Sequence, residues 1–162
     1  MRQIRVLLID DDDLFRKSLV KELKKTGFVV GSAVNAEQGL TKVKSAEWDV
    51  VLLDIRLPDR DGLELLKAIK SFDPSIEVIM LTAYGEVDSA VASLKSGAYH
   101  YLVKPAKLAE IDAAVQKAYE KRGLAIENRM LRDKLKLDQA GDTIVGTSPK
   151  MLELLSLVDR VA

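Results

Sequence analysis

The sequence predicts an α/β protein built on a doubly wound, five-stranded parallel sheet with a helical C-terminal linker. Five short apolar runs lack polar alternation, which is typical of strands buried on both faces. Amphipathic stretches separate these runs, and such an alternation favours a parallel sheet with crossover helices. Right-handed crossovers then make the flavodoxin-like strand order 2-1-3-4-5 the expected topology.

The expected strands and helices alternate as far as about Lys121. The strands are expected at residues 6–9, 28–30, 50–53, 78–81 and 99–103. The helices are expected at residues 14–25, 36–45, 62–71, 87–96 and from Leu108 onward. In the first helix Leu19 and Leu23 keep helical spacing, Asp13 is the expected N-terminal cap, and Gly27 supplies the stop.

Length and composition indicate an ordinary globular protein with one domain and an appendage. The chain has 162 residues, with 25 Lys plus Arg against 25 Asp plus Glu, so no net field favours binding to nucleic acid or to a membrane. It has no cysteine, which excludes disulfides and thiol catalysis. The first apolar run is too short for a signal peptide or a membrane span. We therefore expect a cytoplasmic protein.

The residue pattern changes beyond Lys121, where charges of both signs and spaced leucines continue to Gln139. A break follows at residues 140–142, and then a last helix with Ser148 as its cap and Pro149 at its first position. The expected division is a domain at 1–121, a helical linker at 122–140 and the start of another domain at 141–162.

A polar residue follows directly after four of the five expected strands. These residues are Asp10 with Asp11, Asp54, Thr82 and Lys104. Because ligands of doubly wound sheets bind beyond the carboxyl ends of the strands, we expect these side chains to converge. Alone, the acidic run at residues 10–13 would be a solvated patch with a helix cap, but the joint pattern favours a site.

Three converging carboxylates repel one another by about 4 kcal/mol per close pair at an effective dielectric near 20. A hard divalent cation removes this repulsion, and a site with few carboxylates and open positions suits Mg²⁺. A carboxylate beside the metal can attack a phosphoryl group and form an aspartyl phosphate, which makes Asp54 the candidate phosphoacceptor. Lys104 would supply further positive charge, and the Thr82 hydroxyl would donate a hydrogen bond to the phosphate.

These residues resemble the receiver domains of two-component response regulators over about residues 4–121. The matching segments are VLLIDDD (6–12), DIRLP (54–58) with Asp61-Gly62, LTAY (81–84) and VKP (103–105). The resemblance implies that a sensor histidine kinase phosphorylates Asp54. It also implies that Asp11, Asp54 and the Arg56 carbonyl bind Mg²⁺ directly and that Asp10 binds it through water.

Further features follow from the same resemblance. The Lys104–Pro105 bond would be cis, and Tyr101 would be the aromatic residue that moves together with Thr82. A core or surface tyrosine in an edge strand is the alternative for Tyr101. Ala106 stands where the family often has Phe, which bears on the packing of the last loop. His100 is the only histidine and is expected to be a surface residue of a strand.

The C-terminal part resembles NtrC-type activators, which work with RNA polymerase carrying sigma-54. The segment ENRMLR (127–132) is similar to their linker, and IVGTSPKM (144–151) is similar to the opening of their AAA+ ATPase domain. The phosphate-loop pattern G-x-x-x-x-G-K-[ST] does not occur, so we expect a regulatory phosphoacceptor and not the ATPase itself. The partners implied are a sensor kinase and the AAA+ domain of a longer parent.

Four linker residues fit a short heptad seam, with Leu124 and Leu131 at d and Asn128 and Leu135 at a. A lone Asn at a favours a parallel two-stranded arrangement. We therefore expect a homodimer through the last receiver helix and this linker, with leucines packed back on their own receiver as the alternative.

Three other functions are weighed against this one. A stand-alone receiver with another output would have only a solvated helix as its tail. A magnesium-dependent phosphatase of the haloacid dehalogenase type also uses an Asp nucleophile, but it usually has a second Asp two positions later, where this chain has Arg56. A flavodoxin-like cofactor binder needs a phosphate loop after its first strand, where residues 10–13 would repel a phosphate.

Overall fold

The computed structural model describes residues 3–83, 85 and 87–141, and the side chains among them as far as Leu135. The chain divides into two units, the first ending at Glu120 and the second beginning at Lys121. The segment expected to open a further domain, including the helix expected from Ser148 and Pro149, lies outside the described residues.

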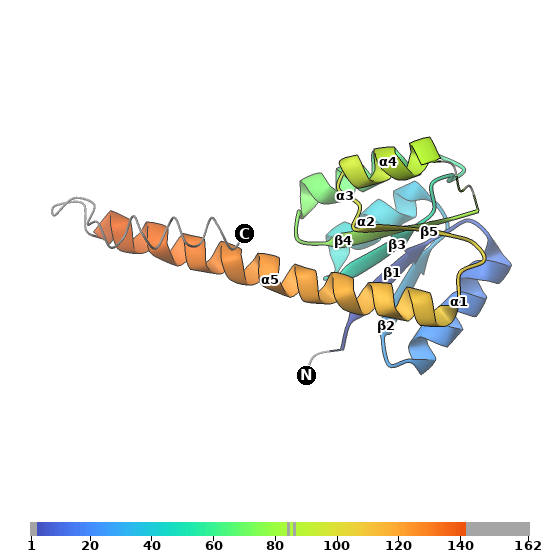
Figure 1. Ribbon diagram of the computed structural model, residues 1–162, viewed down its shortest axis with the longest axis horizontal. Coiled ribbons are helices and arrows are strands. Elements are labelled where there is room, and N and C mark those ends of the chain that lie inside the picture. Colours follow the sequence, from blue (N-terminus) through green and yellow to red (C-terminus); the bar gives the residue numbers. More distant parts are fainter. Residues whose placement is uncertain (1–2, 84, 86, 142–162) are drawn as a thin grey trace. The chain divides into compact units, whose positions relative to one another are not determined.

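The first unit contains one five-stranded parallel sheet in the order β2-β1-β3-β4-β5 (Figure 1). Its strands are β1 (Arg5–Ile9), β2 (Val29–Ala33), β3 (Val50–Leu53), β4 (Glu77–Thr82) and β5 (His100–Val103). The topology predicted from the sequence is therefore confirmed. Parallel pairing places the carboxyl ends of β1, β3 and β4 at the same rim, because Ile9 pairs with Leu53 and Leu53 with Met80.

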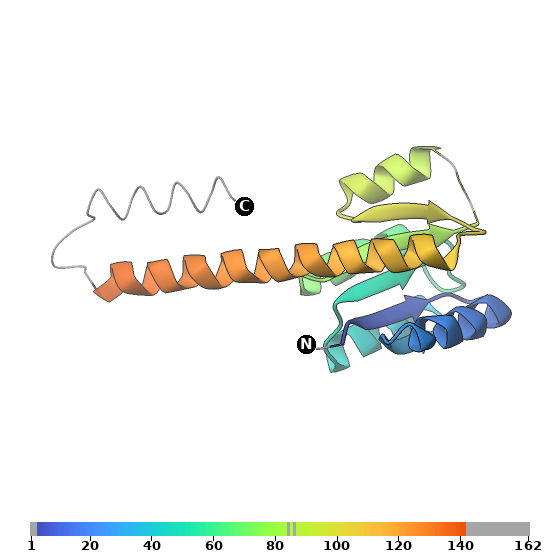
Figure 2. The same cartoon turned by 60° about the horizontal axis from the view of Figure 1, so that its bottom comes forward.

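Helices cover both faces of this sheet and are α1 (Asp13–Lys25), α2 (Ala36–Ser45), α3 (Gly62–Phe72), α4 (Val87–Lys95) and α5 (Leu108–Gly141). Val6 and Leu8 of β1 face one core with α1 and the start of α5. Leu7 and Ile9 face the other core with α2 and α3. The α4 helix lies beside β5 (Figure 2). Successive side chains of β1 point to opposite faces of the sheet, so this one strand contributes to both cores.

The prediction that all strands are buried is wrong for the two edge strands, β2 and β5. We expected every strand to be buried on both faces, but all four residues of β5 and most of β2 are only half-buried or exposed. An edge strand has a neighbour on one side only, so solvent reaches it. The second strand also runs beyond the predicted residues 28–30, because backbone pairing with β1 continues through Gly31 and Ser32 to Ala33.

The prediction that Asp13 caps the first helix is wrong. Asp12 is the cap, with an extended backbone and a side-chain oxygen that accepts a hydrogen bond from the Phe15 N–H at 3.1 Å. The Asp12 carbonyl also accepts the first helical bond, from the Arg16 N–H at 2.8 Å. Asp13 is instead the first helical residue, where it pairs with Arg16. The helix stops as expected before Gly27, whose φ is 104°.

Gly62, the first residue of α3, lies against the backbone at the end of β3. A Cβ at this position would meet the Asp54 carbonyl oxygen at 2.3 Å and two Ile55 backbone atoms at 2.7 Å. These are backbone atoms, which cannot rotate away as a side chain can. Only glycine lets α3 begin this close to the third strand.

Gly62→Ala should therefore destabilise the first unit by about 2 kcal/mol, the usual penalty for overpacking. Urea denaturation followed by circular dichroism measures this. Gly123→Ala is the matched control, because a Cβ there meets nothing within 4 Å. The control should leave the unfolding midpoint unchanged or raise it, and a Gly62→Ala variant as stable as the wild type would contradict the packing argument.

One expectation concerned membranes. Among the helices of the described residues, none is long and apolar enough to span a bilayer.

Candidate functional site

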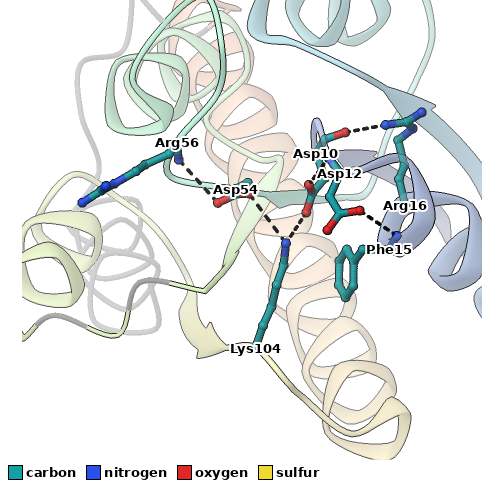
Figure 3. Close-up of polar contacts among 7 residues, drawn as sticks. All are labelled: Asp10, Asp12, Phe15, Arg16, Asp54, Arg56 and Lys104. Atoms are coloured by element: carbon teal, nitrogen blue, oxygen red, sulfur yellow. Dashed lines mark hydrogen bonds and ion pairs between the residues drawn. The ribbon is translucent and has the colours of Figure 1, made fainter.

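Polar residues predicted to converge do so at the carboxyl rim of the sheet, and Figure 3 shows three of them, Asp10, Asp54 and Lys104. Asp10 follows β1, Asp54 follows β3, Thr82 ends β4 and Lys104 follows β5. Asp10, Asp54 and Thr82 are buried, whereas Asp11 is exposed. A cavity of about 440 Å³ opens over them and is lined by Asp11, Asp12, Asp54, Arg56, Leu57, Pro58, Ala83 and Lys104.

Three carboxylates form a cluster that could hold a metal ion. Asp10, Asp11 and Asp54 each offer one oxygen, and these oxygens lie within 4.8 Å of one another. The donor set consists of hard oxygen ligands from only three carboxylates beside an open cavity, which fits Mg²⁺ and leaves positions for water or phosphate oxygens. The residues present therefore fit the metal that the sequence predicted.

Lys104 is the cation at the centre of this cluster. Its Nζ lies 2.6 Å from Asp10 Oδ2 and 3.6 Å from Asp54 Oδ2. The same Nζ lies 4.0 Å from the centre of the Phe15 ring, which holds it by a cation–π contact. One ammonium group thus compensates two buried carboxylates and stands where an incoming phosphoryl group would need positive charge.

The charge of Asp54 is disfavoured by its surroundings. Burial raises the pKa of Asp54 above its ordinary value, and the negative charge of Asp10 adds to the rise. The Lys104 ammonium opposes this rise, as does the Arg56 N–H, which lies 3.4 Å from Asp54 Oδ1. A further cation beside Asp54 would therefore stabilise the ionised form of its carboxyl group.

The acidic loop after β1 is held by contacts that sequence reasoning missed. Asp10 Oδ1 accepts a hydrogen bond from the Asp12 N–H at 2.9 Å, and the Asp10 carbonyl accepts one from Arg16 Nη1 at 2.9 Å. Arg16 is 6% exposed. Its spacing from Leu19 and Leu23 puts a charged residue on the buried face of α1, and that pattern could have indicated a buried partner.

The remaining predicted site residues have mixed surroundings. Arg56 is exposed and is one of the residues that line the cavity, and its side chain points away from Asp54 (Figure 3). Tyr101 is half-buried and packs against the core on the α2–α3 side of the sheet. The Lys104–Pro105 peptide bond is cis, as the resemblance implied. Ala106 packs against the other core, and His100 is exposed as expected.

The linker residues lie in the second unit, within the continuous helix α5. Leu124 is 62% exposed and Leu131 is 47% exposed, whereas Leu135 is buried and Asn128 half-buried. The helix ends at Gly141, so it continues into the break that was expected at residues 140–142.

Comparisons with known proteins agree with this geometry. The family model described as "Response regulator receiver domain" matches residues 6–116. The C4-dicarboxylate transport transcriptional regulatory protein DctD of Rhizobium meliloti is 34% identical over 97% of this chain and 34% of its own length. The DNA-binding transcriptional regulator NtrC of Proteus hauseri is 32% identical over 100% of this chain and 34% of its own length.

Solved structures are similar over about three quarters of this chain. A CheY-like receiver domain protein from Methanospirillum hungatei has a TM-score of 0.73 and 30% identity, covering 75% of this chain and 98% of that one. The response regulator protein TrrA of Thermotoga maritima, solved in complex with Mg(2+)-BeF, has a TM-score of 0.66 and 34% identity, covering 72% and 99%.

The chain thus spans about a third of the length of the curated relatives that it matches. The resemblance to NtrC-type regulators, read first from short segments, is confirmed by relatives that align over nearly the whole chain. The matched family, the parallel sheet and the acidic rim together show that this chain belongs to the receiver domains of two-component response regulators.

Proposed function

We propose that Asp54 is the residue of this receiver that accepts the phosphoryl group from a sensor histidine kinase. One observation carries the proposal: Asp54 is a buried carboxylate at the end of central strand β3, facing the cavity with Lys104 Nζ at 3.6 Å. In the reaction a carboxylate oxygen of Asp54 attacks phosphorus. A new P–O bond forms as the P–N bond of the kinase phosphohistidine breaks, and the electron pair of that bond returns to the histidine.

The proposed metal ligands are Asp11, Asp54 and the Arg56 carbonyl directly, with Asp10 through a water molecule. The oxygen cluster within 4.8 Å supports this set. When bound, Mg²⁺ would neutralise charge on the phosphoryl oxygens. Lys104 contributes a second positive charge from the end of β5, and Phe15 with Asp10 fixes the place of its ammonium.

The proposed switch begins at Thr82. This residue is fully buried beside Asp54, so its hydroxyl can turn toward a phosphate on that carboxylate. Its movement would open space that Tyr101, half-buried on the neighbouring strand β5, can enter. The helix α4, which follows β4, would shift with them. A local charge event thus biases a two-state element.

We infer that the parent protein is a cytoplasmic, sigma-54-dependent AAA+ activator. The alignment with DctD and NtrC extends over the linker as well as the receiver, and both relatives are about three times as long as this chain. The receiver would regulate the parent's ATPase domain without itself binding nucleic acid. Asp54 also has Arg56, not a second Asp, two positions later, which supports a phosphoacceptor over a phosphatase.

We propose that two copies associate through the last receiver helix and the linker. Leu124 and Leu131, at heptad d positions, are exposed apolar side chains of α5. Asn128 lies between them at an a position, where it would fix a parallel register. Two heptads are too few to hold a dimer alone, so the α5 surface near residues 108–118 would contribute.

Asp54→Ala should abolish phosphorylation by acetyl phosphate with Mg²⁺, because the attacking oxygen is lost. Intact-protein mass spectrometry measures the gain of one phosphoryl group. Lys104→Ala should slow it by at least about tenfold through lost charge compensation, and Asp11→Ala should slow it similarly through the loss of a metal ligand. Asp12→Asn is the control, since Asp12 lines the same cavity and its side chain keeps an oxygen to cap α1. Labelling of Asp54→Ala at the wild-type rate would refute the assignment.

Thr82→Ala should still take up the phosphoryl group but lose most of the conformational response, because nothing then connects the phosphate to Tyr101. The readout is the change in amide chemical shifts of α4 and β5 on addition of beryllofluoride. Thr82→Ser keeps the hydroxyl and should respond like the wild type. A full response in Thr82→Ala would rule out this coupling.

The triple variant Leu124→Ala, Leu131→Ala, Leu135→Ala should sediment as a monomer under conditions where the wild type is a dimer. Met130→Ala is the matched control, because Met130 is 67% exposed on the same helix but lies off the a and d positions. Analytical ultracentrifugation gives both results. An unchanged dimer would move the interface elsewhere, and a monomeric wild type at high concentration would exclude the seam.

A further inference from the structure

The loop between β3 and α3 forms one wall of the acidic cavity. Its residues 56–58 line the cavity, and Arg56 carries the backbone carbonyl that we propose as a metal ligand. The base of the loop is closed twice: Arg56 and Asp61 form an antiparallel bridge, and the Gly62 N–H donates to the Ile55 carbonyl at 2.6 Å. These contacts hold the two ends of the loop together but not its tip.

The tip is held by Asp59, which reaches a different element. Its Oδ1 accepts a hydrogen bond from the Ala36 N–H at 2.9 Å, and its Oδ2 accepts one from the Glu37 N–H at 3.0 Å. These are the first two amides of α2. The helix has its own cap as well, since Asn35 Oδ1 accepts from the Gln38 N–H at 2.8 Å. Asp59 therefore caps α2 from another part of the chain.

The negative charge of Asp59 suits its position at the N-terminus of α2. The N–H groups of a helix N-terminus carry partial positive charge, which favours a carboxylate there. The hydrogen bond from Ala36 holds the pKa of Asp59 below its ordinary value, and the one from Glu37 adds to this. Asp59 is therefore ionised at neutral pH and binds both amides as a charged, bidentate acceptor.

We propose that Asp59 is a positioning residue for the metal site: by tying the tip of the β3–α3 loop to α2, it fixes the wall that carries the Arg56 carbonyl. The proposal rests on the proposed magnesium site. It assigns to α2, which contributes no residue to the cavity lining, a direct part in holding that lining in place.

The competing view is that Asp59 only stabilises α2. A variant of Asn35 distinguishes this view from the proposal, because Asn35 caps the same helix turn but is not part of the β3–α3 loop. Asp59→Ala and Asn35→Ala each remove a side-chain acceptor from this turn, so both should lower the thermal unfolding midpoint. Only Asp59→Ala also releases the loop tip.

The test measures Mg²⁺ binding to the whole chain by isothermal titration calorimetry. Asp59→Ala should raise the Mg²⁺ dissociation constant about fivefold, the equivalent of a lost capping interaction. Asn35→Ala should stay within about twofold of the wild type. The rate of phosphorylation by acetyl phosphate should fall in Asp59→Ala at low Mg²⁺ and recover at saturating Mg²⁺.

Asp59→Asn separates anchoring from charge. It removes the negative charge but keeps one acceptor oxygen, so its Mg²⁺ affinity should lie nearer to the wild type than that of Asp59→Ala. Equal losses in Asp59→Asn and Asp59→Ala would assign the effect to charge alone and overturn the proposal. Wild-type affinity in Asp59→Ala, or an equal loss in Asn35→Ala, would also overturn it. A wild type that binds no Mg²⁺ would instead refute the magnesium site itself.

Discussion

The repulsion among the carboxylates at the rim of the sheet is the constraint on which this site depends. Asp10 and Asp54 are both buried, and each has an oxygen within 4.8 Å of the other and of Asp11. Bringing such charges together out of water costs several kcal/mol unless a cation compensates them. Lys104 provides one such charge, at 2.6 Å from Asp10 and 3.6 Å from Asp54. The remaining imbalance is what a divalent metal would relieve.

The sheet makes this arrangement possible at little conformational cost. Parallel strands end at a common rim, each strand is held by hydrogen bonds to its neighbours, and a core lies on each face of the sheet. Asp10, Asp54 and Lys104 each directly follow one of these strands, so their backbones have little freedom. A rigid frame thus holds together charges that would otherwise move apart. Because their repulsion is only partly compensated, binding of a metal or a phosphoryl group changes the energy of the site.

The loops around the rim are held by side chains that have no chemical role of their own. Arg16 binds the Asp10 carbonyl from inside α1, and Phe15 covers the Lys104 ammonium. Asp59 ties the opposite wall to α2. Each of these contacts joins the site to a helix, so that movement of a helix and rearrangement of the site are mechanically linked. This linkage is what a domain that signals by changing shape requires.

The sequence by itself determined the fold class, the strand order and the residues of the acidic rim. It could do so because apolar runs and their spacing identify buried strands, and parallel topology then fixes where their ends meet. Only the tertiary structure decided that Asp12 and not Asp13 caps α1, that β2 and β5 are partly exposed, and that Phe15, Arg16 and Asp59 support the site. The cap at Asp12 and the Arg16 contact depend on the exact backbone path after β1. The exposure of the edge strands and the contacts of Phe15 and Asp59 depend on the distance and direction between segments far apart in the chain, such as the 23 residues between Ala36 and Asp59. Local patterns carry no record of such distances, because three-dimensional packing alone sets them.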